Sequence, residues 1–482
     1  MNSTYRLLFA VVAAAFIACA HYPVNPELKQ APNPGYGYRW ATTDIPTSIQ
    51  TGGNSTFVIL TFSGGGTRAA GFSYGVLKEL DAIDMKDGKK LLDHVNVISS
   101  VSGGSFTSMY YGLHGRDGFK TFESDFLRQN IELRLFHAAF LSPNLFKLLF
   151  SPNFHRIDVA SELYDEVLFK NQTFKDLQNV QPAWHAPLII ANSTEIELGA
   201  RFEWTQDQFD PICSDINGVH VSRAVAASSA FPGLLSPMVL DTYRRCGYAK
   251  PGWATTARSD FYIDPSRPRM ADELDGYTNT ARTNLHMLDG GIADNIGLRA
   301  PLHAIVSSDT FVEPTRHPDR TGFTIANSLS NHEIRRLLLV MVNAGTSSSK
   351  VSIDATSAEP NLKAILGVVT GTPMENYSFD SAQFMLSIFR GRAVDQQTTR
   401  PPNPTVYYPV VLSFSLIKDD KLRAAVNGIG TNFFNLSDEQ FNALMEASKV
   451  LINQDPCFQQ FLADTGVTPP SAPTGQCTAI PR

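Results

Sequence analysis

Ser102 lies in a run of small residues whose pattern suits a catalytic nucleophile. The run Ser100-Val101-Ser102-Gly103-Gly104 follows an apolar, strand-like stretch and precedes one with helical spacing. A serine on such a strand-to-helix turn takes a strained backbone conformation, and the residues two before and two after it must be small so that strand and helix can approach. Ser100 and Gly104 meet that requirement, and we predict that Ser102 is a nucleophile. The alternative is a serine-rich strand end that caps the helix.

A second glycine-rich turn, Ser63-Gly64-Gly65-Gly66-Thr67-Arg68, lies between a strand and a helix earlier in the chain. Gly64, Gly66 and Ala69 fit a dinucleotide-binding pattern, but the next strand ends in serines rather than in an acidic ribose ligand. A P-loop is excluded because no Gly-Lys-Ser/Thr follows. The third interpretation is an oxyanion hole, since glycine N–H groups at a helix N-terminus are unhindered donors. We predict that Gly64, Gly65 and Gly66 form it.

Asp289 supplies a carboxylate much later in the chain. It begins the sequence Asp289-Gly290-Gly291-Ile292-Ala293-Asp294-Asn295. Its plain interpretation is an Asp-Gly turn, which is common in proteins. By itself the segment is therefore a weak signal for catalysis, and Asp289 is a candidate only in combination with the other motifs.

The elements around these residues alternate between strand and helix. Strands are expected at residues 57–62, 94–99, 187–191 and 337–342, and helices at residues 72–83, at the residues leading to Leu113, and at residues 437–452. Alternation of this kind predicts an α/β fold in which helices cover a parallel sheet. Polar stretches rich in Pro and Gly at residues 249–284, 307–332 and 395–405 are expected to be excursions from one elaborated domain.

Taken together in this order, the motifs resemble the patatin-like phospholipase family. That family shows a Gly-Gly-Gly-x-Arg loop, a nucleophile elbow and an Asp-Gly-Gly or Asp-Gly-Ala segment, here Gly64 to Arg68, Ser102 and Asp289, and the segment Ala227-Ser228-Ser229-Ala230-Phe231-Pro232-Gly233 resembles a fourth family block. The resemblance spans residues 57–344. It implies a three-layer α/β/α fold with a mostly parallel central sheet, and a Ser102–Asp289 dyad that needs no histidine, metal or cofactor.

The resemblance also implies a substrate class, namely phospholipid or another acyl-ester lipid. It gives Arg68 two roles, support of the glycine loop or contact with a lipid phosphate, while a structural ion pair is the alternative. Two other functions stay open. One is an α/β-hydrolase esterase in which His303 or His317 completes a Ser-Asp-His triad, and the other is a catalytically silent lipoprotein that binds lipid.

A Leu- and Phe-rich segment lies between the elbow and the aspartate, at residues 133–141 and 145–150. Such residues most often form a core helical pair. The other interpretation is a helical cap insertion whose apolar face enters lipid and guides acyl chains to Ser102. We expect the cap, because an enzyme that acts on lipid needs a route for its substrate.

The first 18 residues are typical of a secretory or lipoprotein signal peptide, with Arg6 before an apolar run that is too short to span a bilayer. Phe16-Ile17-Ala18-Cys19 resembles a lipobox, with an uncommon first residue, and we predict that Cys19 is lipidated. A plain secretory peptide is the alternative. The absence of aspartate at position 20 favours the outer membrane. We therefore expect a protein of the cell envelope at a membrane surface.

The charge of the chain argues against one class of partner, and its cysteines agree with export. The net charge is −6 and no long basic run is present, so nucleic acid is not expected as a partner. After Cys19, four cysteines remain in an oxidising compartment. Pairing Cys213 with Cys246 and Cys457 with Cys477 gives the shortest loops, and four free buried thiols are the alternative. The expected organisation is a signal peptide at 1–18, a flexible tether at 19–55, the hydrolase domain at 56–455 and a disulfide-stapled tail at 456–482.

Overall fold

The fold is built on one mixed β-sheet. The computed structural model describes residues 25–33, 35–40, 55–151, 154–184, 186–262, 265–306, 329, 334–346, 362–431, 435–469, 477–478 and 480. The strands are β1 (Thr56–Phe62), β2 (Val95–Val101), β3 (Leu188–Glu195), β4 (Ala200–Glu203), β5 (Met238–Asp241), β6 (Asn284–Asp289), β7 (Arg336–Asn343) and β8 (Val406–Ser413). Strands β1, β3 and β7 are buried along nearly their whole length, as expected for strands covered on both faces.

The sheet has the order β5-β6-β3-β2-β1-β7-β8, and β4 pairs with β3 outside this path. The pairs from β3 to β8 are parallel. Strand β6 runs antiparallel to β3, and β5 runs antiparallel to β6. Because β6 runs against β3, Ser193 near the end of β3 lies opposite Asp289, the last residue of β6. This reversal brings Asp289 to the region where the central parallel strands end.

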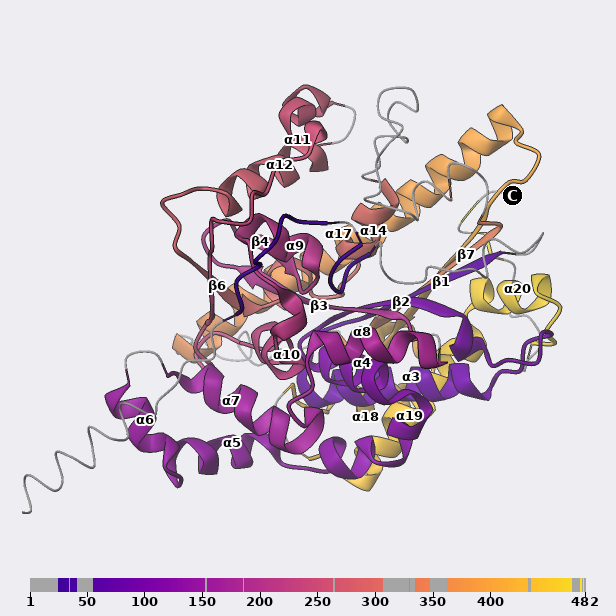
Figure 1. Ribbon diagram of the computed structural model, residues 1–482. Coiled ribbons are helices and arrows are strands. Elements are labelled where there is room, and N and C mark those ends of the chain that lie inside the picture. The colour runs from indigo at the N-terminus through magenta and orange to yellow at the C-terminus, as the bar shows by residue number, and fades with distance from the viewer. Residues whose placement is uncertain are drawn as a thin grey trace, which may run out of the picture.

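Helices cover both faces of the sheet and complete a three-layer α/β/α fold (Figure 1). Helices α3, α4 and α19 pack together on one face, and α14 and α17 contact the sheet from the other. The α-helices are α3 (Gly66–Ala82), α4 (Gly103–His114), α5 (Ile131–Phe140), α6 (Asn144–Phe150), α7 (Arg156–Tyr164), α8 (Phe174–Trp184), α9 (Gln206–Phe209), α10 (Val221–Ser228), α11 (Gly252–Thr256), α12 (Ser266–Tyr277), α13 (Gly291–Asp294), α14 (Arg299–Val306), α17 (Leu362–Thr399), α18 (Asp420–Asn427), α19 (Asp438–Gln454) and α20 (Pro456–Asp464).

The N-terminal segment that the structure describes is folded onto the domain, whereas the sequence predicts a flexible tether there. Residues 25–33 and 35–40 lie on the domain rather than apart from it. The Asn25 amide donates to Ser214 Oγ at 2.8 Å, Tyr38 is fully buried, and the Arg39 guanidinium pairs with Asp207 and Asp210 at 3.0 and 2.9 Å. The prediction failed because it relied on apolar periodicity, whereas this segment is held by hydrogen bonds and ion pairs to residues far along the chain.

Two further boundaries differ from the prediction. Helix α20 continues the fold beyond residue 455, since Phe458, Phe461 and Leu462 are buried and the helix packs against β8. Helix α17 spans 38 residues and contains Pro373. It ends at Thr399 and thus includes part of the stretch 395–405, which the sequence predicts to be an excursion. Its apolar residues follow no helical period, so the helix could not be predicted from their spacing.

The predicted signal peptide at residues 1–18, Cys19 and most of residues 307–332 lie outside the described residues. Among the helices that the structure describes, none combines the length and the apolar character that a membrane span requires.

Candidate active site

Ser102 occupies the turn between β2 and α4. Strand β2 ends at Val101, α4 begins at Gly103, and Ser102 between them has φ 50° and ψ −119°. An L-residue rarely adopts a positive φ, and such strain is typical of functional turns. The strain turns the side chain out of the sheet at the N-terminus of α4, where the helix dipole favours negative charge.

The small residues around Ser102 are required by close packing. A Cβ at Gly104 would lie 2.7 Å from the Cβ of Phe62 on β1, so strand and helix could not approach with a larger residue there. Ser100 occupies the position where the family pattern has glycine. Its hydroxyl bonds to the Ser108 hydroxyl at 2.7 Å and to the Ile190 carbonyl at 3.1 Å. The Ser100 side chain therefore fits at this position, because its buried hydroxyl has hydrogen-bond partners.

Asp289 and Ser102 meet in the structure. The Ser102 hydroxyl lies beside the Asp289 carboxylate and lowers its pKa, and the N–H of Gly291 donates to Asp289 Oδ1 at 2.8 Å. Both residues are buried, with Ser102 7% and Asp289 4% exposed. Burial raises the pKa of the Asp289 carboxyl to about 6, although the bonds from Gly291 and Ser102 act in the opposite direction. The carboxylate is thus a better base than an exposed aspartate and is still ionised at neutral pH.

Ser228, for which no role was predicted, joins the turn at Ser102 to the segment that begins at Asp289. Its hydroxyl accepts the Ser102 N–H at 2.9 Å and donates to the Asn192 carbonyl of β3 at 2.7 Å. Its carbonyl accepts the N–H of Gly290 at 3.1 Å. Ser228, at the end of α10, therefore holds three parts of the fold in place: the turn at Ser102, strand β3, and the residues that follow Asp289. The only sequence signal was its place in the family-like segment that begins at Ala227.

The glycine loop lies against the elbow. A Cβ on Gly103 would lie 2.0 Å from the Gly66 carbonyl oxygen, and one on Gly64 would lie 3.4 Å from the Cβ of Ser102. The N–H of Gly64 donates to the Asn295 carbonyl at 2.9 Å, so this amide is engaged and the prediction of three equivalent donors needs correction. Gly65 and Gly66 stand at the N-terminus of α3, where amides have no partner within the helix.

Arg68 lies behind this loop and is buried. It donates to the Ile429 carbonyl at 2.7 Å, and its Nη2 would lie 3.5 Å from a Cβ at Gly65. Burial lowers the pKa of its guanidinium to about 10, so it stays cationic at neutral pH. No carboxylate among the described residues pairs with it, so the alternative of a structural ion pair finds no partner in this part of the chain. These contacts suit loop support, while contact with a lipid phosphate stays a prediction.

Histidine is not part of this arrangement among the described residues. The Asp289 carboxylate accepts the N–H of Gly291 and lies beside the Ser102 hydroxyl. His303 lies on α14 with its Nδ1 3.2 Å from the Arg201 guanidinium, and burial together with nearby arginines lowers the pKa of its ring well below the usual value. His317 lies outside the described residues. The triad alternative therefore receives no support from His303.

The four predicted disulfide cysteines form two bonds in the structure. Cys213 is joined to Cys246, and Cys457 is joined to Cys477. The first bond packs beside Leu28, where the N-terminal segment lies on the domain. The second joins the start of α20 to a residue near the C-terminus.

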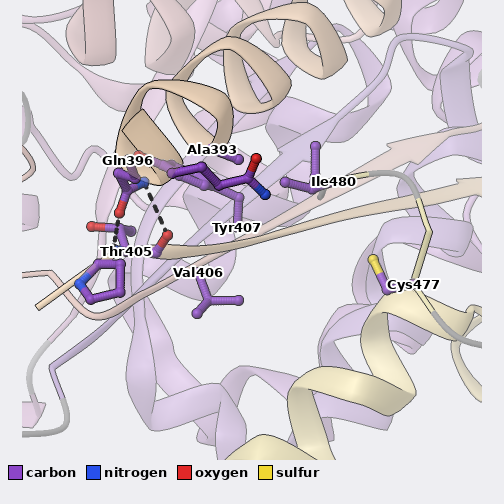
Figure 2. Close-up of a pocket in the computed structure, with 9 residues that line it drawn as sticks. Ala393, Gln396, Thr405, Val406, Tyr407, Cys477 and Ile480 are labelled. Carbon is purple, nitrogen blue, oxygen red and sulfur yellow. Dashed lines mark hydrogen bonds between the residues drawn. The ribbon is translucent and has the colours of Figure 1, made fainter. Parts of the chain in front are cut away.

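A separate cavity of ≈ 330 Å³ lies away from the dyad. Figure 2 shows its lining, in which the side chains of Gln396, Tyr407 and Ile480 surround the space near the end of α17 and the start of β8. The start of β8 pairs with the start of β7, which pairs with the start of β1. The cavity therefore lies at the amino ends of the parallel strands, opposite the edge that carries Ser102.

A family model agrees with the geometry of the site. The model of the patatin-like phospholipases matches residues 60–302, which include the glycine loop, Ser102, Ser228 and Asp289. The chain belongs to the patatin-like phospholipase family. Its members are lipid ester hydrolases.

Solved structures give weaker likenesses. Human GIVD cytosolic phospholipase A2 is 12% identical with a TM-score of 0.43, over 87% of this chain and 64% of that chain. VipD from Legionella pneumophila is 11% identical with a TM-score of 0.27, over 83% of this chain and 68% of that chain. The chain thus spans less than two thirds of the human protein. No curated protein matches it in a sequence comparison.

Proposed function

We propose that this patatin-like protein is a serine acyl ester hydrolase of the phospholipase A or lysophospholipase type. The observation that carries the proposal is the contact between Ser102, on a strained strand-to-helix turn, and the buried Asp289 carboxylate. A serine hydroxyl is a poor nucleophile until a neighbouring base takes its proton. The substrate class, an acyl-ester lipid, follows from the family to which the chain belongs.

The reaction proceeds in two halves. In the first, Asp289 takes the Ser102 proton while Oγ attacks the ester carbonyl carbon, and the tetrahedral intermediate then expels the alcohol, which leaves with the proton from Asp289. An acyl-enzyme ester on Ser102 remains. In the second half, Asp289 takes a proton from water, the resulting hydroxide attacks the acyl carbon, and the carbon–Oγ bond breaks. Ser102 regains its proton from Asp289 and the fatty acid is released.

Backbone groups stabilise the negative oxygen that forms in both halves. The amides of Gly65 and Gly66 start α3 beside the elbow, and a preorganised donor of this kind contributes about 3 kcal/mol to transition-state stabilisation. The positive end of the α4 dipole lies at Ser102 itself. Arg68 holds the glycine loop from behind and adds a buried positive charge. These residues require no metal for the chemistry that we propose.

A covalent probe tests the assignment of the nucleophile. An alkyl fluorophosphonate is expected to label the purified protein once, on the peptide that contains Ser102. Ser102→Ala should abolish labelling. Ser229→Ala is the matched control, because the hydroxyl of Ser229 bonds to the Val225 carbonyl of its own helix at 2.8 Å. Stoichiometric labelling of the Ser102→Ala variant, or of another serine in the wild-type protein, would place the nucleophile elsewhere.

We also propose that the protein is exported and anchored through a lipidated Cys19 in the cell envelope, on the outer membrane or facing the periplasm. The two disulfide bonds support an oxidising compartment. Mass spectrometry of the mature N-terminus should find an acylated Cys19, and Cys19→Ser should release the protein from membranes. An unmodified N-terminal peptide that begins after a different cleavage site would disprove the anchor and leave the hydrolase proposal standing.

A further inference from the structure

Helices α5 and α6 present an apolar surface to solvent. In α5 the exposed residues Leu133, Phe136 and Phe140 recur at helical spacing, and the rings of Phe136 and Phe140 contact each other at 5.0 Å between centroids. No residue of α6 is buried. The exposed side chains on this surface, called here the cap surface, are Leu133, Phe136, Phe140, Leu141, Phe146, Leu149 and Phe150. Leu141 and Leu149 are 70% and 65% exposed.

The cap surface is the outer side of a small folded unit and not a loosened part of the core. Ala139 of α5 packs with Phe154 and Val159 in a small cluster separate from the main core. Helix α5 also contacts α7, and the three helices lie together at the lower left of Figure 1. The helix pair is therefore apolar on both sides. An amphipathic helix whose inner side is already packed would be expected to carry polar residues on its outer side.

Helix α7, which contacts α5, links the cap helices to the segment that holds Asp289. The Arg156 guanidinium at the start of α7 donates to the Gly233 carbonyl at 3.1 Å, and the Asp289 N–H donates to the Ala230 carbonyl at 3.0 Å. Phe231, between these two contacts, and Leu234, directly after Gly233, are 41% and 40% exposed. Exposed apolar side chains thus continue from the helix pair toward Asp289.

Charge and chain length indicate what covers this surface. Residues 131–150 contain one carboxylate, Glu132, and two strong bases, Arg134 and Lys147. Both bases pair with α7 or its extension, Arg134 with Glu166 and Lys147 with Glu162. The surface is therefore nearly neutral and suits an uncharged apolar medium rather than an acidic partner. Cys19 is only six residues before Asn25, which is bonded to the domain, so a lipidated Cys19 stays within about 20 Å of it.

We infer that the cap surface docks on the hydrocarbon boundary of a lipid bilayer and holds the Ser102 site at the membrane. The inference rests on the proposed function, because it assumes that the substrate is delivered from a membrane. Exposed Phe and Leu side chains insert below the headgroups, which removes their apolar area from water. The short connection to Cys19 and the cap surface then act together, one as the anchor and the other as the part that orients the enzyme.

The experiment measures partition of the mature protein onto vesicles. Cys19→Ser is used as the background, so that binding does not depend on an acyl anchor. On phosphatidylcholine vesicles, Phe136→Ser/Phe140→Ser/Leu149→Ser should bind at least tenfold more weakly than the background protein. Phe261→Ser/Tyr262→Ser is the control, since Phe261 and Tyr262 are exposed aromatic residues, at 54% and 97%, on a segment near α11, which lies far from α5 and α6 in Figure 1. It should bind within twofold of the background protein.

Because the cap surface is nearly neutral, added phosphatidylglycerol or 0.5 M salt should change binding by less than threefold, unlike binding through basic residues. As a second measurement, Phe136→Trp should add an emission, over that of the background protein with its four tryptophans, that shifts to the blue on vesicles and that brominated phosphatidylcholine quenches. Three results would overturn the inference: unchanged binding by the triple variant, an unquenched tryptophan, or conversion of a dimer to a monomer by the triple variant while vesicle binding stays the same.

Hydrolysis of a water-soluble short-chain ester, measured in parallel, separates the two proposals. A background protein that binds vesicles through the cap surface but hydrolyses neither the soluble ester nor phosphatidylcholine would refute the proposed function alone. A protein that hydrolyses the soluble ester while its vesicle binding is insensitive to the triple variant would refute the docking surface alone.

Discussion

At the scale of single residues, Ser228 shows how the dyad is held in place. Ser102 adopts a strained backbone conformation, which takes its N–H out of the ladder that β2 forms with β3. The Ser228 hydroxyl accepts that N–H, while the Ser228 carbonyl accepts the N–H beside Asp289. The strain at the nucleophile is thus balanced by hydrogen bonds from a residue that also positions the base.

Ser228→Ala should therefore lower kcat and leave KM nearly unchanged. The substitution leaves the buried Ser102 N–H and Asn192 carbonyl without their partner, a cost of about 1–3 kcal/mol that corresponds to a loss of roughly 10- to 100-fold in rate. Steady-state kinetics on a soluble ester measure this, with Ser229→Ala as the neighbouring control. A matching loss in both variants would show a general effect of changing this helix end and not a positioning role for Ser228.

The pH dependence of kcat/KM reports the Asp289 carboxyl. Burial raises its pKa to about 6, and only the ionised form can accept the Ser102 proton. Activity should be full above pH 7 and fall about tenfold for each pH unit below 6, because protonation removes the base. A profile recorded between pH 4 and pH 8 with a soluble ester checks this. Full activity at pH 4.5 would show that Asp289 is not the titrating base.

The sequence pointed to the candidate nucleophile and base more readily than to the residues that hold them. Ser102 and Asp289 stand in local motifs, where small neighbours are needed for close packing, and such needs can be seen in one stretch of sequence. Ser228, Asn192 and Asn295 act through contacts across the sheet, which no local pattern records. The engaged amide of Gly64 was missed for the same reason, since its acceptor lies far along the chain.

At the scale of elements, the glycine loop and the start of α3 form one unit with the elbow. Gly65 has φ 134°, a conformation that residues with a side chain rarely adopt. Its built Cβ would lie 3.3 Å from the Cβ of Ala69 and 3.5 Å from Nη2 of Arg68. Any side chain at Gly65 would thus disturb both the backbone and the packing of the loop.

Gly65→Val should be nearly inactive, with a loss of at least 100-fold in kcat, since the strained backbone and the β-branched side chain move the oxyanion donors. Gly88→Val is the matched control. Gly88 also has a positive φ of 80°, but nothing lies within 4 Å of its Cβ position, so its substitution tests backbone strain alone. We expect it to keep its specific activity. Normal turnover by Gly65→Val would place the oxyanion hole elsewhere.

The regular elements of the sheet were predictable, whereas the longest helix was not. The strands expected at residues 57–62 and 337–342 correspond to β1 and β7 within one residue at each end, because buried parallel strands are short apolar runs. The start of α19 follows from Ser437, whose side chain caps the helix together with Gln440. Helix α17 has no such period, since it contains Pro373 and several glycines.

At the scale of the whole molecule, the first and last segments that the structure describes are tied to the domain. Leu28 and Tyr36 pack beside the bond between Cys213 and Cys246, and the bond between Cys457 and Cys477 ties α20 to a later residue. The sequence could suggest these pairs by their short spacing. It could not show that the N-terminal segment is folded, because its anchoring contacts, such as Arg39 with Asp210, join residues 171 positions apart.

The disulfide bonds should contribute to stability. Non-reducing peptide mapping of the exported protein should find Cys213 linked to Cys246 and Cys457 linked to Cys477. Cys457→Ser/Cys477→Ser should lower the free energy of unfolding by about 3 kcal/mol, since a bond that closes a loop of 20 residues restricts the unfolded chain. The wild-type protein in reductant is the control. Four free thiols in the exported protein would contradict the bonds and weaken the case for an oxidising compartment.

The central claim is that Ser102 and Asp289 catalyse ester hydrolysis without a histidine. The most direct measurement compares kcat on a soluble ester and on phosphatidylcholine for the wild-type protein, Ser102→Ala, Asp289→Asn, His303→Ala and His317→Ala, with each fold checked by thermal unfolding. The account predicts a loss of at least 1,000-fold for the first two variants and activity within tenfold of wild type for the two histidine variants. Turnover retained by Asp289→Asn, or lost in a folded histidine variant, would contradict it.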